Sequence, residues 1–182
     1  MRNFLTSIGS AAVVIAALAS IPAMAATQGT LGATSTGTVV ISASVPNRAR
    51  ITGLSDVAFT NQDPNAAASN AQNVCVWSNT ATKGYTVTAS GSGTSSAFTL
   101  ANGLLTVPYS VAWNASSGAI TGTALATGTA SAGLVSTATQ QICSSGPATT
   151  SSLIVGITTV DLGGMQAATS YTGTLTLVVT PQ

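Results

Sequence analysis

Residues 171–180 read Tyr-Thr-Gly-Thr-Leu-Thr-Leu-Val-Val-Thr, and residues 37–45 read Gly-Thr-Val-Val-Ile-Ser-Ala-Ser-Val. In both stretches apolar side chains recur at every second position, the period by which a β-strand presents side chains to one face. One face of the C-terminal stretch carries Leu175, Leu177 and Val179, and one face of the N-terminal stretch carries Val39, Ile41, Ala43 and Val45. A strand near the start of a chain can pair within its own domain or be lent to a neighbouring molecule. The two ends therefore predict a β fold and raise the question of where the first strand pairs.

The first 25 residues have the three parts of a secretory signal peptide. Arg2 supplies a positive charge, residues 8–21 form an apolar segment, and residues 23–25 read Ala-Met-Ala, a small-residue cleavage site. The alternative, a membrane anchor, is disfavoured because the apolar run is short and is broken by serine and proline. No later segment approaches the ~18 consecutive apolar residues of a spanning helix. We expect cleavage before Ala26, export, and no membrane span in the mature chain.

Composition limits the possible partners. Cleavage leaves 157 of the 182 residues, enough for one domain. The whole chain is 45% hydrophobic and only 4% charged. The mature part has a formal net charge of zero. Its three positive residues are Arg48, Arg50 and Lys83, and its three negative residues are Asp56, Asp63 and Asp161. There is no basic stripe for nucleic acid, and near-zero net charge favours association over a free monomer.

The two cysteines, Cys75 and Cys143, stand in a chain that we expect to be exported, where a disulfide is the default. A redox pair or a metal site is the functional alternative. The chain has no histidine and no glutamate to complete a metal site. We therefore expect a structural disulfide between two β elements of the core.

Helical periodicity is nearly absent from the mature chain, whereas short apolar alternations separated by turn residues recur throughout. This spacing predicts an all-β sandwich. Residues 115–139 are rich in Ser, Thr, Ala and Gly. Their pattern is compatible with either a weak hairpin around 118–127 or a mobile loop. The expected strands are 38–45, 48–53, 57–60, 73–78, 85–89, 98–100, 104–113, 140–144, 153–159 and 171–180.

Three of these strands carry an apolar face that alternates with small or polar residues, and together they predict the core of a two-sheet sandwich. The three faces are Tyr85, Val87 and Ala89; Tyr109, Val111 and Trp113; and Leu153, Val155 and Ile157.

The mature chain lacks most of the side chains that enzymes use. Without histidine, the Ser-His-Asp and Cys-His arrangements are impossible. A glycosidase would have to use two of the three aspartates, each of which lies near an expected turn or strand end. No zinc ligand set and no calcium-binding run is present. The sequence predicts a protein that is not an enzyme and that needs no cofactor or metal.

Trp77 and Trp113 have two readings. Either indole can stack on a sugar ring, or it can fill the core of the sandwich. Trp77 is two residues from Cys75 and hence on the same face of a strand, which favours packing on the disulfide. We favour the core for both side chains.

The order of segments resembles the bacterial chaperone-usher pilins, most of all the archaic, Csu-type and spore coat protein U-like branch. The likeness rests on residues 37–45, on residues 51–59 (Ile-Thr-Gly-Leu-Ser-Asp-Val-Ala-Phe) and on the closing run at 167–180, in which Tyr-Thr-Gly-Thr precedes the alternating strand. It implies an immunoglobulin-like sandwich that lacks its final strand and is completed by donor-strand exchange. The implied donor face is Val39, Ile41, Ala43 and Val45, and the implied acceptor groove is flanked by Leu175, Leu177 and Val179.

The resemblance also implies a biological setting. The partners would be identical or related pilin subunits, a periplasmic chaperone and an outer-membrane usher, and the chain would travel through the periplasm to a surface pilus that supports adhesion or biofilm formation. The domains would be a signal peptide (1–25), an N-terminal extension with the donor strand (26–46) and a pilin domain (47–182). The alternative is a stand-alone secreted β-sandwich that binds a glycan or a surface through Trp77 or Trp113.

Overall fold

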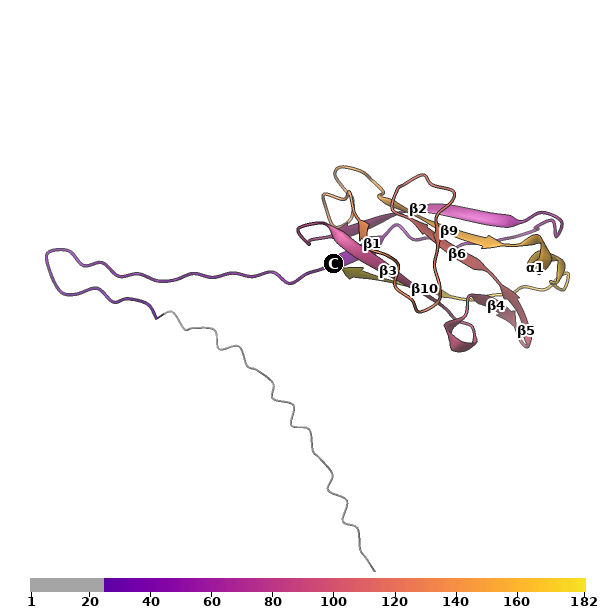
Figure 1. Ribbon diagram of the computed structural model, residues 1–182, viewed down its shortest axis with the longest axis horizontal. Coiled ribbons are helices and arrows are strands. Elements are labelled where there is room, and N and C mark those ends of the chain that lie inside the picture. The colour runs from indigo at the N-terminus through magenta and orange to yellow at the C-terminus, as the bar shows by residue number, and fades with distance from the viewer. Residues whose placement is uncertain (1–24) are drawn as a thin grey trace, which may run out of the picture. The chain divides into compact units, whose positions relative to one another are not determined.

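The structure is a computed structural model that describes residues 25–182 (Figure 1). The chain divides into two units, Met1–Val45 and Pro46–Gln182. The predicted signal peptide, apart from Ala25, lies outside the described residues.

In the first unit, the described residues 25–45 make one isolated antiparallel bridge. The Thr27 backbone N–H donates to the Thr38 carbonyl at 2.9 Å, and the Thr38 N–H donates back at 3.0 Å. All of these residues are exposed, and residues 39–45 belong to no strand. The expected strand at 38–45 is therefore represented only by the bridge at Thr38.

The second unit is nearly all β, which confirms the prediction of an all-β fold. Its strands are β1 (Ala49–Thr52), β2 (Ala68–Ser78), β3 (Gly84–Gly91), β4 (Thr99–Asn102), β5 (Leu105–Pro108), β6 (Ser110–Asn114), β7 (Thr123–Ala124), β8 (Leu134–Val135), β9 (Ser151–Ile157) and β10 (Leu175–Pro181). The helical elements are short: η1 (Thr94–Ser96) and α1 (Thr159–Gly163). α1, β4 and β5 lie at one end of this unit, and the C-terminus lies at the other (Figure 1).

The strands form two larger sheets and one separate hairpin. The five-stranded sheet has the order β1-β2-β9-β6-β7, and the three-stranded sheet has the order β10-β3-β8. The hairpin is β4-β5, and all strand pairs are antiparallel. β1 and β10 are each the edge strand of a sheet, and these two edges approach each other.

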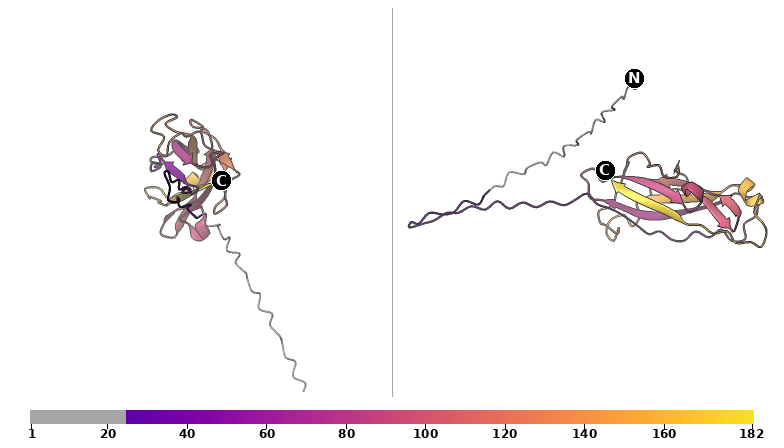
Figure 2. Two further views of the ribbon diagram at one scale, coloured as in Figure 1. Left: turned by 90° about the vertical axis from the view of Figure 1, so that its left-hand side faces the viewer. Right: turned by 90° about the horizontal axis from the view of Figure 1, so that it is seen from below.

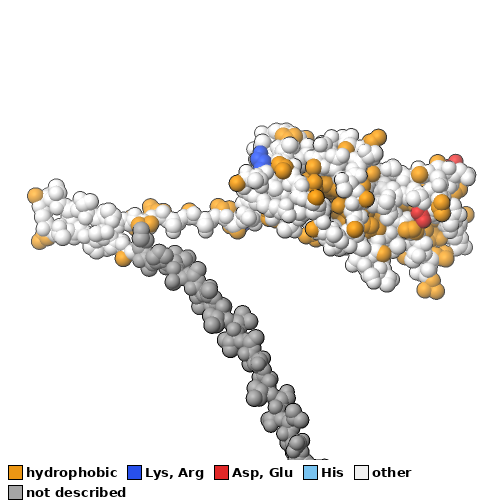
Figure 3. Space-filling model, viewed as in Figure 1, with side chains coloured by type: hydrophobic (Ala, Val, Ile, Leu, Met, Phe, Trp, Pro, Cys, Tyr) orange, Lys and Arg blue, Asp and Glu red, His pale blue; other side chains and the backbone are white. Residues whose placement is uncertain are grey.

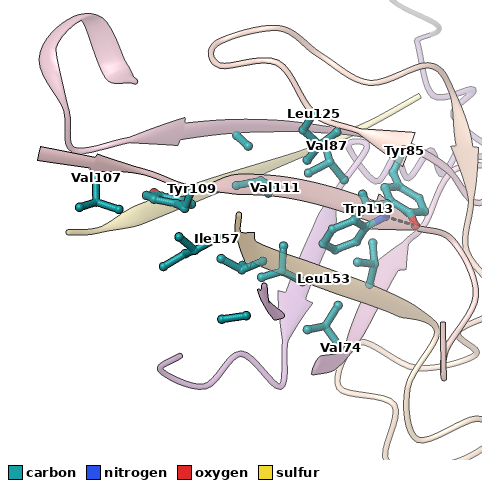
Figure 4. Close-up of a cluster of buried hydrophobic side chains, with 14 of the residues drawn as sticks. Val74, Tyr85, Val87, Val107, Tyr109, Val111, Trp113, Leu125, Leu153 and Ile157 are labelled. Carbon is teal, nitrogen blue, oxygen red and sulfur yellow. Dashed lines mark hydrogen bonds between the residues drawn. The ribbon is translucent and has the colours of Figure 1, made fainter. Parts of the chain in front are cut away.

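The core lies between the two sheets, and it contains all three predicted apolar faces (Figure 4). Trp113 is 2% exposed, and its indole Nε1 donates a hydrogen bond to the Tyr85 hydroxyl at 3.3 Å. That hydroxyl also shares a hydrogen bond of 2.9 Å with Ser151. The buried polar groups are thus paired, as a low-dielectric interior requires. The core reading of Trp113 is confirmed.

Two of the strands expected in the second unit are absent. Residues 57–60 are extended but join no strand. Residues 140–144 form a turn, in which the Cys143 N–H donates to the Gln140 carbonyl at 3.1 Å and Cys143 has a φ of +50°. The prediction of a strand at 140–144 is wrong, because a residue in the left-handed region cannot continue a strand.

Other elements begin or end at residues different from those expected, and each difference has a local cause. The expected strand 104–113 is interrupted between β5 and β6, where Pro108 lacks a backbone N–H. The helix α1 was not expected; the Thr158 hydroxyl caps it by accepting from the Asp161 N–H at 3.2 Å. In the open stretch 115–139, only the short strands β7 and β8 form.

Candidate functional site

An apolar groove of about 380 Å³ opens on the second unit. One wall is the extended segment 54–59, and the other wall is the start of β10 together with Gly173. Side chains of the core form the floor: Tyr109, Leu153 and Val155. An apolar cavity of about 150 Å³ holds one benzene molecule. The volume of this groove is therefore sufficient for about two side chains of that size. In the right-hand view of Figure 2, the segment after β1 runs along one margin of the unit without a strand arrow, and β10 ends at the C-terminus.

The first wall is held by a side chain instead of a backbone ladder. Gly53 ends β1 with a φ of +83°, a conformation that glycine adopts without strain, and the chain leaves the sheet there. The Ser55 N–H then donates to Gln72 Oε1 at 2.8 Å, and Gln72 Nε2 donates to the Ser55 carbonyl at 3.1 Å. One amide of β2 therefore substitutes for one rung of strand pairing, and it keeps segment 54–59 extended beside the groove.

The second wall is an edge strand. β10 pairs with β3 from Leu175 opposite Gly91 to Pro181 opposite Tyr85, and among the described residues no other strand pairs with it. Its alternate side chains Leu175, Leu177 and Val179 pack against the core yet stay only partly buried. An edge strand offers unpaired N–H and C=O groups on its free side. The wall thus presents both apolar side chains and a row of backbone hydrogen-bonding groups.

The floor is aromatic and aliphatic. The rings of Tyr109 and Phe98 lie 5.7 Å apart between centroids at an interplanar angle of 35°. Burial raises the pKa of the Tyr109 hydroxyl above its ordinary value of 10.0, because low-dielectric surroundings disfavour the charged phenolate. The floor therefore favours an uncharged, apolar occupant.

Charge is scarce around the groove. Asp56 is the charged residue of its lining, and that side chain is exposed. Asp63 accepts a hydrogen bond from the Asn65 N–H, and Asp161 lies in the first turn of α1. On the face shown in Figure 3, charged side chains are a few isolated spots among hydrophobic and neutral surface. Within residues 25–182 there is no cluster of three side chains able to hold a metal ion.

The predicted site residues fall into two groups. Leu175 and Leu177 line the groove, whereas Val179 packs against the core further along β10 and does not line it. The donor residues belong to the first unit and are exposed; the exposed fractions of Val39, Ile41 and Val45 are 71%, 88% and 76%. The role of both groups stays a prediction.

Sequence reasoning missed the wall opposite β10. It placed a strand at 57–60, where Val57 and Phe59 line the groove from an extended but unpaired segment. The Gln72 amide, 17 residues from Ser55 in the chain, gives no periodic signal. The apolar residues Val57 and Phe59, two positions apart on either side of Ala58, are the one available hint.

The expected disulfide is present: Cys75 and Cys143 are bonded at an S–S distance of 2.05 Å, with 6.0 Å between their Cα atoms. It joins a strand to a turn, not two strands. The bond lies outside the main core, in a separate small cluster with Ala138, against which Trp77 packs. Trp77 is therefore not part of the sandwich core.

No protein-family model and no curated protein sequence matches the chain. Among residues 25–182, no helix is long and apolar enough to cross a membrane.

Proposed function

We propose that this protein is the structural subunit of an extracellular chaperone-usher pilus and that it polymerises by donating residues 37–45 to the groove of a neighbouring subunit. The groove belongs to an immunoglobulin-like sandwich that lacks one strand. The observation that carries the proposal is an apolar groove beside the free edge of β10, in a chain whose exposed N-terminal segment has apolar side chains at every second position.

The chemistry of the two parts is complementary. A strand laid along β10 would place alternate side chains in the groove and turn the others outward. Val39, Ile41, Ala43 and Val45 fit this requirement, since all four would point to one side. Burial of each larger aliphatic side chain contributes on the order of 1.5–3 kcal/mol. Neither the donor nor the groove floor carries a charge that would have to be desolvated.

The dimensions also agree. The seven residues of β10 span about 23 Å at ~3.3 Å per residue, and the nine residues 37–45 span about 30 Å. A donated strand can therefore cover the whole free edge of β10 and satisfy its backbone groups. Pro46, which cannot donate to a ladder, marks the end of the donor.

Donation from one subunit to the next runs head to tail and does not close on itself, so it generates a filament. Before assembly, the open groove and free edge are an aggregation hazard. A periplasmic chaperone that covers the groove and an outer-membrane usher that delivers subunits would manage this hazard. The expected signal peptide is consistent with that route, and adhesion or biofilm support is the expected role of the filament.

Polymer ladders on unheated gels test the proposal. Ile41→Asp would bury an unpaired carboxylate at the joint, at a cost of several kcal/mol, whereas Ser42→Asp points the same charge outward. With the chaperone co-expressed, we expect monomer for Ile41→Asp and a ladder for Ser42→Asp. Normal ladders from Ile41→Asp, together with a loss of thermal stability of its monomer, would place the strand in its own domain and refute the proposal.

A further inference from the structure

A second hollow, shallow and widely open to solvent, with a volume of about 430 Å³, lies on the second unit away from the groove, and no residue lines both. β1 and β2 form one side of it. Arg50 of β1 stands directly opposite Trp77 of β2 in the antiparallel register, so both side chains project from the same face of the sheet. Cys75 shares that face because it is two residues from Trp77 along β2.

The turn 139–144 forms the other side, and it is firmly held. Cys143 is bonded to Cys75, and its N–H donates to the Gln140 carbonyl at 3.1 Å. The Thr139 hydroxyl donates to the Ser145 carbonyl at 2.6 Å. The side chains of Gln140 and Gln141 are exposed on this turn beside the hollow. The backbone of the turn is thus fixed, and the Gln140 side chain is held in addition by the Ser144 hydroxyl, which donates to Gln140 Oε1.

The hollow combines three kinds of group that a sugar acid requires. The partly buried indole of Trp77 offers an apolar face for the C–H side of a pyranose ring. The glutamine amides can donate to and accept from hydroxyl groups. Arg50, which is exposed, supplies a planar guanidinium that matches a carboxylate.

The charge at this place is also unusual for the chain. Only four of the 182 residues are Lys or Arg, and two of them, Arg48 and Arg50, stand two positions apart at the start of β1. Arg48 directly precedes β1, so a second positive charge stands two positions from Arg50 in the chain. No aspartate lines the hollow. The local field therefore favours an anionic ligand.

We infer that this hollow binds a uronic acid residue of an acidic polysaccharide, with the ring on Trp77, the hydroxyls on Gln140 and Gln141, and the carboxylate on Arg50. The inference does not rest on the proposed function, because the hollow shares no residue with the groove.

The test measures the affinity of the mature protein for a galacturonic acid trisaccharide, followed by the fluorescence of its tryptophans or by calorimetry. The fully methyl-esterified trisaccharide serves as the neutral probe, and a sulfated dextran oligomer of equal charge serves as the general polyanion. We expect the acid to bind at least about tenfold more tightly than its ester. We also expect it to bind more tightly than the sulfated oligomer, which lacks the carboxylate.

Variants separate the three contacts. Arg50→Gln should lower the affinity for the acid to that for the ester, whereas the matched charge change Lys83→Gln should leave both affinities unchanged. Trp77→Ala should weaken acid and ester together; because Trp77 also packs on the disulfide, Gln141→Ala at an exposed position gives a second measure of the loss. The inference is overturned if the acid does not bind, if the sulfated oligomer binds as well as the acid, or if Lys83→Gln and Arg50→Gln lower the affinity equally.

Discussion

Residues 37–45 and strand β10 carry the same alternating apolar pattern, yet their surroundings differ. In β10, the alternate side chains Leu175, Leu177 and Val179 pack partly against the core and the backbone pairs with β3. In residues 37–45, the corresponding side chains are exposed and no strand forms beyond the bridge at Thr38. The comparison teaches that an apolar period of two makes a segment able to form a β-strand. Whether the strand forms depends on a neighbouring strand edge with which it can pair.

The largest expected difference between the core of the second unit and residues 37–45 is in the free energy of unfolding of the monomeric mature chain. Trp113→Ala removes a buried indole and its hydrogen bond to Tyr85, so it should lower that free energy by about 3–5 kcal/mol. Ile41→Ala removes an exposed side chain and should change it by less than about 0.5 kcal/mol. Urea denaturation measures both. A loss of more than about 1 kcal/mol for Ile41→Ala in the monomer would remove the contrast.

A smaller effect is expected at the wall opposite β10. Gln72→Ala removes the two amide hydrogen bonds to the Ser55 backbone and should cost about 1–2 kcal/mol. Hydrogen exchange should accelerate in residues 54–60 and stay slow in β9. Gln62→Ala is the control, because its side chain bonds only to the nearby Thr60 carbonyl. Equal exchange in the two variants would show that Gln72 does not hold this wall.

The smallest effect concerns the ionisation of Tyr109 on the groove floor. Burial raises its pKa above 10.0, so the neutral phenol favours folding. This contribution is fully present below the unfolded pKa of about 10 and is lost as the pH rises through the folded pKa. A donated strand would bury the hydroxyl further and shift its titration to still higher pH in the polymer. Ultraviolet titration of monomer and polymer, with Tyr109→Phe to assign the signal, checks this; identical curves would mean that the groove stays open in the polymer.

Much of the sandwich could be predicted from the sequence because β3, β6 and β9 each place alternate large apolar side chains in the core between the sheets. The alternation of apolar residues in the sequence indicates these positions directly, as at Tyr85, Val87 and Ala89 in β3 and at the corresponding residues of β6 and β9. The acceptor groove beside Leu175, Leu177 and Val179 is implied by the family resemblance, and its role stays a prediction.

The remainder depended on contacts that leave no period in the sequence. The turn at 140–144 is set by the left-handed backbone at Cys143 and by its bond to Cys75, 68 residues away. The helix α1 is too short for a helical apolar repeat, and only its Thr158 cap signals it. The wall at 54–59 depends on a single amide from β2. Long-range pairing of single side chains is what pattern reasoning cannot supply.

The most direct test of strand donation mixes two defective subunits. Ile41→Asp disrupts the donor segment and leaves the groove intact. Leu177→Asp disrupts the groove and leaves the donor segment intact. Thr176→Asp, on the exposed face of β10, is the matched control for Leu177→Asp. Folding of each variant is checked first by its intact disulfide and its circular dichroism.

Native mass spectrometry of the separate and mixed samples then decides. The account predicts monomers from Ile41→Asp alone and from Leu177→Asp alone, polymers from Thr176→Asp, and one-to-one dimers that grow no further when the two defective subunits are mixed. Such dimers arise because the one functional donor fills the one functional groove. Polymers from either defective variant alone, or monomers after mixing, would contradict strand donation into this groove.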